Sequence, residues 1–170
     1  SGAGSRGTRS RTTAAPRRIL FVRTDRLGEV LLNLPAIMAL RAAYPHARLS
    51  VLVNQELKQL LSGLAGVDAW LDYRQPAGRT WWMAAAGLAR EWRAHRFDLM
   101  VISNPKKEFH VAAWLAGVPV RVGYDRKWGC LLTHRLPDRK SLGERHEVEY
   151  NLELIRAAGA AARVPVWRMP

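Results

Sequence analysis

The sequence predicts an α/β fold of the Rossmann-like type, a mostly parallel sheet with helices on both of its faces. Short apolar segments, which suit strands buried on both faces, alternate with longer segments whose apolar residues recur every three or four positions. Strands that alternate with helix-length segments form right-handed βαβ units and therefore parallel sheets. Polar residues and glycines follow several apolar segments, at the sheet edge where ligands bind in such folds.

The first half of the chain begins with a strand at Ile19–Val22, and the apolar spacing from Leu27 predicts a helix that ends near Ala43. Pro35 lacks an amide hydrogen, so we expect a kink or a late start in this helix. Its inward face is expected to hold Leu27, Leu31, Leu34 and Met38, with Val30 and Ile37 beside them. The elements that follow are a strand at 49–53, a short helix at 55–61 with Leu57, Leu60 and Leu61 inward, a strand at 67–73 and a helix at 81–95.

The second half of the chain continues the alternation. The predicted elements are a strand at 99–102, a helix at 109–115, a strand at 120–123, a short sixth strand within 131–136 and a helix at 143–158 that Gly159 ends. Tryptophans supply several of the expected packing anchors. Trp82, Leu88 and Trp92 are expected to hold the helix at 81–95 in place, and Trp114 is expected to join Trp92 in the core.

The length of 170 residues is enough for one domain with a substantial core. We expect residues 1–17 to form a flexible basic tail, residues 18–159 to form the Rossmann-like domain and residues 160–170 to begin a connector. The single cysteine, Cys130, excludes an intramolecular disulfide and a cysteine-cluster metal site. No apolar run approaches the roughly 20 residues of a membrane-spanning helix.

The chain carries a formal net charge of +13, and residues 1–18 contain five arginines and no acid, so +8 remains on the rest. Such a charge favours anionic partners, which include lipid headgroups, phosphorylated glycans, nucleotides and nucleic acids. The alternative is a basic surface that only keeps the protein soluble. No aromatic-basic strand motif or base-reading helix is evident, so we expect no specific binding of nucleic acid.

The first strand is followed by the polar loop that is the main candidate for a site. It contains Asp25, Arg26 and Gly28, and Glu29 comes directly after the glycine at the start of a helix. The partial positive charge of a helix N-terminus favours a carboxylate there. A carboxylate at a cleft can also remove the proton of an attacking hydroxyl group. The alternatives are that Glu29 only complements the helix dipole and that Asp25 caps the helix.

Several common catalytic motifs are absent from the sequence. The first loop has one glycine where a dinucleotide-binding turn has three, and no phosphate-binding loop of the G-x-x-x-x-G-K-[ST] type occurs. H-E-x-x-H and G-x-S-x-G are also missing. We therefore expect no bound cofactor and no metal ion.

Two further polar loops follow the predicted strands at 99–102 and 120–123. We assign substrate binding to Asn104, Lys106 and Lys107 in the first and to Tyr124, Asp125, Arg126 and Lys127 in the second, together with Asp25, Arg26 and Gly28. Arginine binds phosphate and carboxylate groups bidentately, and lysine acts as a point charge. The alternative for each basic residue is a solvated loop charge. Trp128, beside Gly129 in the last loop, is the tryptophan that we expect to stack on a sugar.

The order and spacing of three segments resemble the heptosyltransferase family of glycosyltransferases. The segments are Arg23–Leu31 with Pro35, Leu40-Arg41 and Tyr44-Pro45; Ala116–Asp125, which is similar to the family's A-G-x-x-x-R-x-G-(Y/F)-D; and His146–Leu152, which is similar to its last helix. The resemblance covers about Arg18 to Gly159.

This resemblance implies a GT-B architecture, in which the amino-terminal half binds the acceptor and the carboxyl-terminal half binds the nucleotide-sugar donor. It implies transfer of heptose, or a related sugar, from ADP-heptose to a lipopolysaccharide core or similar anionic glycan, with inversion and without a metal. The family's proposed base, usually aspartate, corresponds to Glu29. The expected location is the cytoplasm, with peripheral contact at the inner membrane.

The chain ends where the donor-binding half of such an enzyme begins, so we do not expect it to transfer sugar alone. Residues 18–159 would be the acceptor-binding half of an enzyme that a donor-binding domain completes. The competing hypothesis is a non-catalytic module on the same fold that binds anionic glycans or membrane surfaces.

Overall fold

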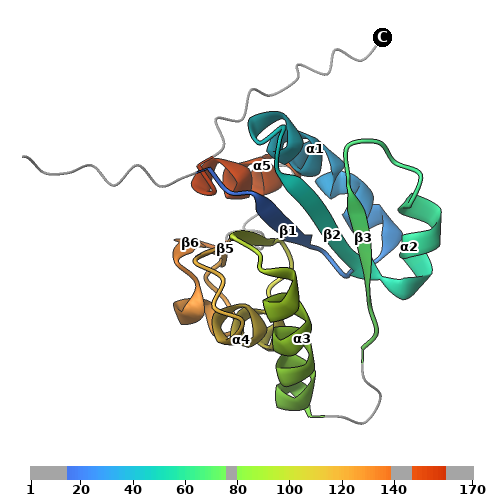
Figure 1. The fold of residues 1–170 in the computed structure, drawn as a ribbon. Helices are drawn as coiled ribbons and strands as arrows, with labels where there is room; N and C mark the ends of the chain where they lie inside the picture. Colours follow the sequence, from blue (N-terminus) through green and yellow to red (C-terminus); the bar gives the residue numbers. More distant parts are fainter. Residues whose placement is uncertain (1–14, 76–79, 139–146, 160–170) are drawn as a thin grey trace, which may run out of the picture.

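The computed structural model describes residues 15–75, 80–138 and 147–159, and it confirms the α/β Rossmann-like fold. Within these residues, six strands form one sheet in the order β3-β2-β1-β4-β5-β6, and every neighbouring pair is parallel (Figure 1). The strands are β1 (Arg18–Val22), β2 (Arg48–Asn54), β3 (Ala69–Tyr73), β4 (Leu99–Ile102), β5 (Val120–Tyr124) and β6 (His134–Leu136).

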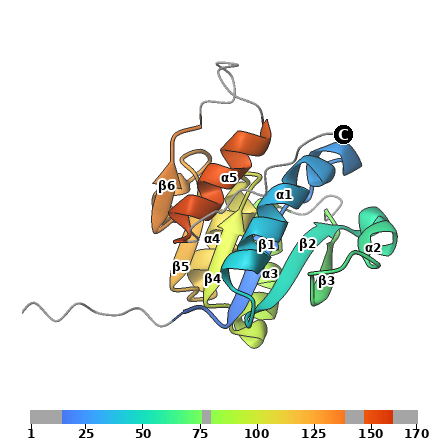
Figure 2. The ribbon, with the colours of Figure 1, turned by 90° about the horizontal axis from the view of Figure 1, so that it is seen from above.

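Helices cover both faces of this sheet, as Figures 1 and 2 show. Helices α1 and α5 pack on one face, and α3 and α4 pack side by side on the other, while α2 lies beside β2 and β3. The helices are α1 (Leu27–Ala43), α2 (Gln55–Leu61), α3 (Trp81–His95), α4 (Lys107–Leu115) and α5 (Glu147–Ala157), with a short 3₁₀ helix, η1, at Gly129–Leu131.

The central strand β1 shows why two cores form. Ile19 and Phe21 face the core under α1 and α5, whereas Leu20 and Val22 face the core under α3 and α4. Successive side chains of a strand point to opposite faces of the sheet, so both sets must be apolar when both faces are covered. All four residues are buried, as the uninterrupted apolar run in the sequence predicted.

The predicted elements are found close to their predicted bounds, with small differences. Strand β3 begins at Ala69 rather than Val67, and the first four residues of the predicted last helix, 143–146, lie outside the described residues. Helix α1 begins at Leu27 and runs through Pro35, so the alternative of a late helix start is wrong. A proline removes only its own backbone donor, and the hydrogen-bond ladder on either side of it can continue.

Four apolar residues that were expected to be inward are exposed: Leu31, Leu60, Trp82 and Trp114. Helix α1 instead buries Val30, Ala36, Ile37 and Leu40 together with the polar Asn33, which turns its inward face away from Leu31. Helix α4 is apolar around most of its circumference and buries Phe109, His110, Ala112 and Ala113. Apolar spacing alone therefore could not identify its outward side, which carries Trp114.

The first testable prediction concerns the core under α3 and α4. Trp92 is fully buried and its ring lies 6.3 Å from that of Phe109, centroid to centroid, so Trp92→Ala leaves a cavity. We expect a loss of about 3–5 kcal/mol in the free energy of unfolding, measured with urea. Trp114→Ala is the matched control, because Trp114 is 52% exposed, and we expect it to change stability by less than about 1 kcal/mol. Equal losses in the two variants would contradict this assignment of the core.

Candidate functional site

The candidate site is built around the side chain of Arg23, which directly follows the central strand β1. Arg23 is only 4% exposed, although it carries a permanent charge. Its Nη1 atom donates to the backbone oxygen and to Oγ of Ser103, each at 3.2 Å, at the end of the neighbouring strand β4. Both residues lie at the carboxyl edge of the sheet, meaning the edge at which the parallel strands end, where ligands bind in folds of this type.

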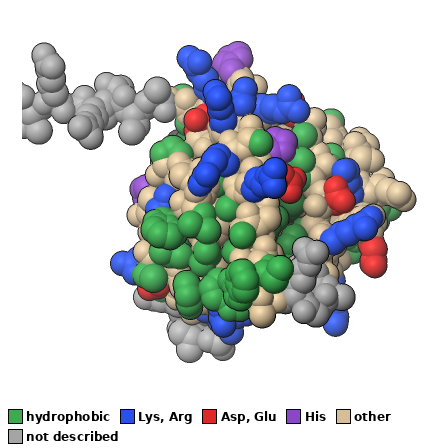
Figure 3. Space-filling model, turned by 60° about the horizontal axis from the view of Figure 1, so that its bottom comes forward, with side chains coloured by type: hydrophobic (Ala, Val, Ile, Leu, Met, Phe, Trp, Pro, Cys, Tyr) green, Lys and Arg blue, Asp and Glu red, His purple; other side chains and the backbone are tan. Residues whose placement is uncertain are grey.

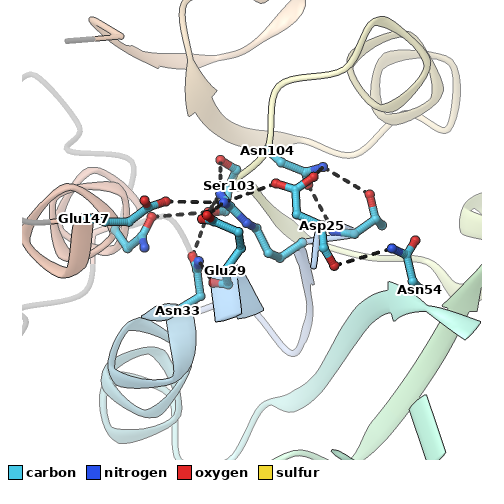
Figure 4. A network of polar contacts seen from close by, with 10 residues as sticks. Asp25, Glu29, Asn33, Asn54, Ser103, Asn104 and Glu147 are labelled. Carbon is cyan, nitrogen blue, oxygen red and sulfur yellow. Dashed lines mark hydrogen bonds and ion pairs between the residues drawn. The ribbon is translucent and has the colours of Figure 1, made fainter. Parts of the chain in front are cut away.

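Three carboxylates meet the other terminal nitrogen of Arg23. Nη2 lies 2.7 Å from Oε2 of Glu29, 3.1 Å from Oδ2 of Asp25 and 3.3 Å from Oε1 of Glu147. Figure 4 shows these acidic side chains converging from the first loop, from α1 and from α5. Among the described residues, one guanidinium thus contacts three carboxylates at this point.

A chain of hydrogen bonds fixes the backbone that carries Glu29. Ser103 Oγ donates to Oδ1 of Asn33 at 2.7 Å, and Nδ2 of Asn33 donates to the backbone oxygen of Glu29 at 2.7 Å (Figure 4). Asn33 and Ser103 are fully buried. Because buried polar groups need partners, this chain links α1 to β4 at the base of the site.

Asn104 performs a similar task for the first loop. Its Oδ1 atom accepts from the Thr24 amide at 3.3 Å, and its Nδ2 atom donates to Thr24 Oγ1 at 3.1 Å and to Asp25 Oδ1 at 3.4 Å. Asn54, at the end of β2, donates from Nδ2 to the backbone oxygen of Asp25 at 3.4 Å. Residues at the ends of β2 and β4, the two strands that flank β1, thereby hold the loop that follows β1.

Glu29 is the acidic residue of this network that can best reach a bound molecule. Its side chain is 40% exposed, against 36% for Asp25 and 27% for Glu147. The neighbouring Gly28 leaves open space, because a Cβ atom placed there would meet nothing within 4 Å. A carboxylate that is oriented by a buried arginine and is still partly exposed can accept a proton from a hydroxyl group.

The basic residues predicted to bind substrate lie farther along the carboxyl edge. The Lys106 ammonium lies 5.5 Å from the ring centroids of both Tyr73 and Phe109, and that of Lys107 lies 5.8 Å from the ring centroid of Trp81. Arg126 is exposed and pairs with Asp138 at 3.4 Å. None of the contacts found among the described residues joins these three side chains to Glu29.

The other predicted substrate-binding residues have different surroundings. Arg26 is the exposed N-cap residue of α1, and Asp125 is exposed with its Oδ1 atom 3.9 Å from Nη1 of Arg135. Tyr124 is 1% exposed at the end of β5, and burial is the main cause that raises the pKa of its hydroxyl group. Tyr124 therefore offers almost no surface to a ligand.

The loop after β5 has a strained backbone that presents Trp128. Lys127 and Trp128 both have left-handed backbone angles, with φ of 47° and 69°. Such angles cost energy in residues other than glycine and often occur at functional sites. The Trp128 ring contacts the Trp81 ring edge to face at 5.0 Å between centroids, so two indoles and Lys107 lie together.

A buried histidine stabilises this loop. Nδ1 of His110 lies 2.9 Å from the backbone oxygen of Lys127, and because a carbonyl can only accept, Nδ1 must carry the proton. His110 is fully buried, and this burial lowers the pKa of its imidazole group below the usual 6.5. A neutral imidazole therefore holds the strained turn in place.

The structure thus brings together only some of the predicted residues: Asp25, Glu29 and Asn104. It also reveals residues that the sequence analysis did not assign to the site, chiefly Arg23, Asn33, Ser103 and Glu147. One signal was available, since Asn33 interrupts the apolar stripe formed by Val30, Ile37 and Leu40. Nothing in the sequence relates Glu147 to Arg23, 124 positions away.

Other features of the molecule do not suggest a different site. A hollow of about 260 Å³ lies at the opposite edge of the sheet, where β1 and β2 begin, and is lined by Arg18, Arg48, Ser50, Ala94, His95 and Phe97. It contains no carboxylate, and ligands of parallel α/β sheets bind at the other edge. Among the described residues, no group of three or more His, Cys, Asp or Glu is arranged to hold a metal ion. No helix in the described part of the chain has the length and hydropathy needed to cross a membrane.

Comparison with known proteins shows that the chain is similar to glycosyltransferases in sequence and in fold. No family model matches the sequence. The chain is 29% identical over 150 residues to a Haemophilus influenzae protein described as "Putative glycosyltransferase", and this match covers 88% of the chain and 42% of that protein.

Two solved structures share the fold. The family 9 glycosyltransferase of Veillonella parvula matches with a TM-score of 0.68 and 21% identity, over 85% of this chain and 41% of that one. The E. coli ADP-heptose lipopolysaccharide heptosyltransferase II matches with a TM-score of 0.64 and 20% identity, over 81% and 40%. The fold is that of a family 9 glycosyltransferase. The comparisons confirm the resemblance noted in the sequence, and the chain spans about two fifths of each relative's length.

The second testable prediction concerns Arg23. Arg23→Met removes the positive charge that contacts Asp25, Glu29 and Glu147 among the described residues, so the repulsion between these carboxylates increases. We expect a loss of about 3 kcal/mol in the free energy of unfolding, because breaking a buried ion pair leaves uncompensated charge. Arg126→Met is the matched control, with an expected loss below about 1 kcal/mol, since Arg126 is exposed. Urea unfolding measures both, and equal effects would show that Arg23 is not the centre of the network.

The third prediction concerns the pH dependence of stability. Burial lowers the pKa of His110 in the folded protein below 6.5, its usual value in the unfolded chain. The stability contributed by neutral His110 is therefore complete above about pH 6.5 and is lost as the pH falls below that value. His110→Gln keeps a donor for the Lys127 oxygen but cannot titrate. Between about pH 7.5 and about pH 5, the free energy of unfolding measured with urea should fall less steeply in this variant than in the wild type. Parallel pH profiles of the two proteins would refute the role assigned to His110.

Proposed function

We propose that this chain is the acceptor-binding part of an inverting, metal-independent glycosyltransferase of the heptosyltransferase type. The complete enzyme would transfer heptose, or a related sugar, from a nucleotide-sugar donor to a lipopolysaccharide core or similar anionic glycan. Glu29 would act as the general base that removes a proton from the attacking acceptor hydroxyl. Arg23 would be a positioning residue that holds the Glu29 carboxylate toward the acceptor.

The observation that carries the proposal is the placement of Glu29 on a fold of the family 9 type. Its carboxylate is bound at 2.7 Å by a buried guanidinium and is still 40% exposed. A catalytic group needs a fixed orientation, since a misplacement of about 1 Å can cost roughly 100-fold in rate. The ion pair with Arg23 and the hydrogen bond from Asn33 to the Glu29 backbone supply that orientation.

The basic residues of the carboxyl edge would receive the charged groups of the acceptor. Lys106, Lys107, Arg126 and Lys127 would bind phosphate or carboxylate groups of the glycan, while Asp25 and Asn104 would bind its hydroxyls. Asp25, Arg26 and Gly28 belong to the first loop and would line the acceptor site, and Tyr124 and Asp125 would lie at its border. The separation of acidic and basic groups along one edge suits an acceptor that carries a neutral reacting hydroxyl and anionic groups elsewhere.

The donor would be bound mainly by a part that this chain does not contain. The chain covers about 41% of the family 9 structure from Veillonella parvula, so a second portion of similar size would complete the enzyme. Such an enzyme would work in the cytoplasm in peripheral contact with the inner membrane, where a glycolipid acceptor is anchored. It would need no resident cofactor.

The ion pair between Glu29 and Arg23 also favours a second, non-catalytic function. If Glu29 serves only to balance the charge of Arg23, its exposure has no catalytic meaning. The chain would then be a non-catalytic module that binds anionic glycans or membrane surfaces.

The fourth prediction separates these functions by titration calorimetry and by a transfer assay. The chain alone should bind a bisphosphorylated, Kdo-containing glycan fragment but not a neutral oligosaccharide of the same size, and it should show no robust turnover with ADP-heptose. In the enzyme completed by its donor-binding part, Glu29→Gln should lower kcat by about 100- to 10,000-fold and leave KM for the acceptor nearly unchanged.

Two outcomes would decide against the proposal. Unchanged turnover in Glu29→Gln would show that Glu29 is not the general base, whereas glycan binding without any turnover by the completed protein would favour the non-catalytic module. Robust turnover by the chain alone would show that a separate donor-binding part is not required. Glu29→Asp serves as the conservative control, because it keeps the carboxylate and should retain more activity than Glu29→Gln.

A further inference from the structure

Exposed apolar side chains gather on α3, α4 and the loop before η1. Trp82 and Met83 on α3, Trp114 and Leu115 on α4, and Trp128 in the loop are between 40% and 58% exposed. Figure 3 shows hydrophobic side chains gathered on the face that comes forward when the lower side of Figure 1, where α3 and α4 lie, is turned toward the viewer. Exposed apolar side chains that gather on one face of a protein often mark an interaction site.

The two helices form a firm base for this surface. They pack closely along their lengths, and Nη2 of Arg93 near the end of α3 donates to the backbone oxygen of Leu115 at 2.6 Å. At their other ends, Trp81 of α3 contacts Trp128 and lies under Lys107 of α4. The exposed side chains are therefore presented by a rigid surface.

Basic residues accompany the apolar ones on both helices. Met83 and Arg90 on α3, and Lys107 and Trp114 on α4, are each seven positions apart, which places the members of each pair on one side of their helix. Arg90, Lys107 and Lys127 are exposed on these elements, where the exposed acidic residues are Glu91 and Asp125. The chain as a whole carries a formal net charge of +13.

These observations select the occupant of the surface. A second copy of a chain with a net charge of +13 would be repelled, whereas an anionic surface would be attracted. Indoles are enriched where one end of a side chain is apolar and the other is wet, as in the interfacial region of a bilayer. Basic residues beside them gain about 1 kcal/mol each from anionic lipid headgroups.

We propose that the α3–α4 surface, defined by Trp82, Met83, Trp114, Leu115 and Trp128, docks the protein on an anionic lipid bilayer. The indoles would enter the headgroup region and Arg90 would contact lipid phosphates, while Lys107 and Lys127, which are assigned to the glycan, would add to the attraction of an anionic surface. The inference rests on the proposed function in one respect, that the acceptor is membrane-anchored. Because Trp128 and Lys107 also border the carboxyl edge, docking would bring a glycolipid headgroup to the candidate site.

The experiment is flotation of the 170-residue chain with vesicles, without glycolipid and without nucleotide sugar. Vesicles of phosphatidylethanolamine with phosphatidylglycerol should bind the chain, and vesicles of phosphatidylcholine alone should bind it far more weakly. The double variant Trp82→Ala/Trp114→Ala should lower partitioning by about tenfold or more, and Arg90→Gln should lower it about fivefold. Leu60→Ala is the matched control, because Leu60 is 64% exposed on α2, and it should leave partitioning unchanged.

Tryptophan fluorescence supplies a second measurement that distinguishes insertion from simple charge attraction. Emission should shift to the blue with anionic vesicles and be quenched by brominated acyl chains, and both effects should weaken in the double variant. Met83→Glu leaves every indole in place and should also weaken vesicle binding. It therefore tests the surface independently of any folding defect in the double variant.

Several outcomes would overturn the proposal. They are equal binding of the double variant and the wild type, binding without any change in fluorescence, and no binding to either vesicle. A dimer that the double variant abolishes, seen by ultracentrifugation without vesicle binding, would assign the surface to a second copy instead. Because the vesicles contain no acceptor, these results do not depend on whether the glycosyltransferase proposal succeeds.

Discussion

The buried guanidinium of Arg23 is the constraint on which the architecture of the carboxyl edge depends. It lies at the end of the central strand, where both faces of the sheet are covered, so water cannot hydrate its charge. A buried charge is tolerated only when it is paired and hydrogen-bonded. Ser103 from β4, Glu29 from α1, Asp25 from the first loop and Glu147 from α5 supply those partners, which ties four separate parts of the chain to one point.

Much of the fold could be predicted because its signals are local. A four-residue apolar run such as Ile19–Val22 specifies a strand with two covered faces, and the 3.6-residue period specifies the helices between strands. The rule that parallel strands present their following loops at one edge correctly brought Asp25, Glu29 and Asn104 together. Side-chain exposure was less predictable. Helix α4 has more apolar residues than one buried face can hold, so spacing could not show that Trp114 points outward.

The sequence predicted only those residues of the site that directly follow a strand. The pairing of Arg23 with Glu147 depends on where α5 packs, and no local pattern encodes that distance. The charge distribution along the edge also depends on how the loops are placed in space. Lys106 and Lys107 extend over aromatic rings on the α3–α4 side, while the carboxylates collect around Arg23, so one edge contains an acidic region and a basic region.

The contact between Arg23 and Glu147 spans 124 positions in the chain, and it has a consequence for biosynthesis. Strand β1 and its loop leave the ribosome early, but the third carboxylate arrives only with the last described helix. Until α5 docks, the nascent chain holds a charged side chain at the end of its central strand with an incomplete set of partners. Nascent chains that end after β6 and before Glu147, or that lose α5 to a protease, would still contain all six strands but would lack one of the carboxylates that pair with Arg23.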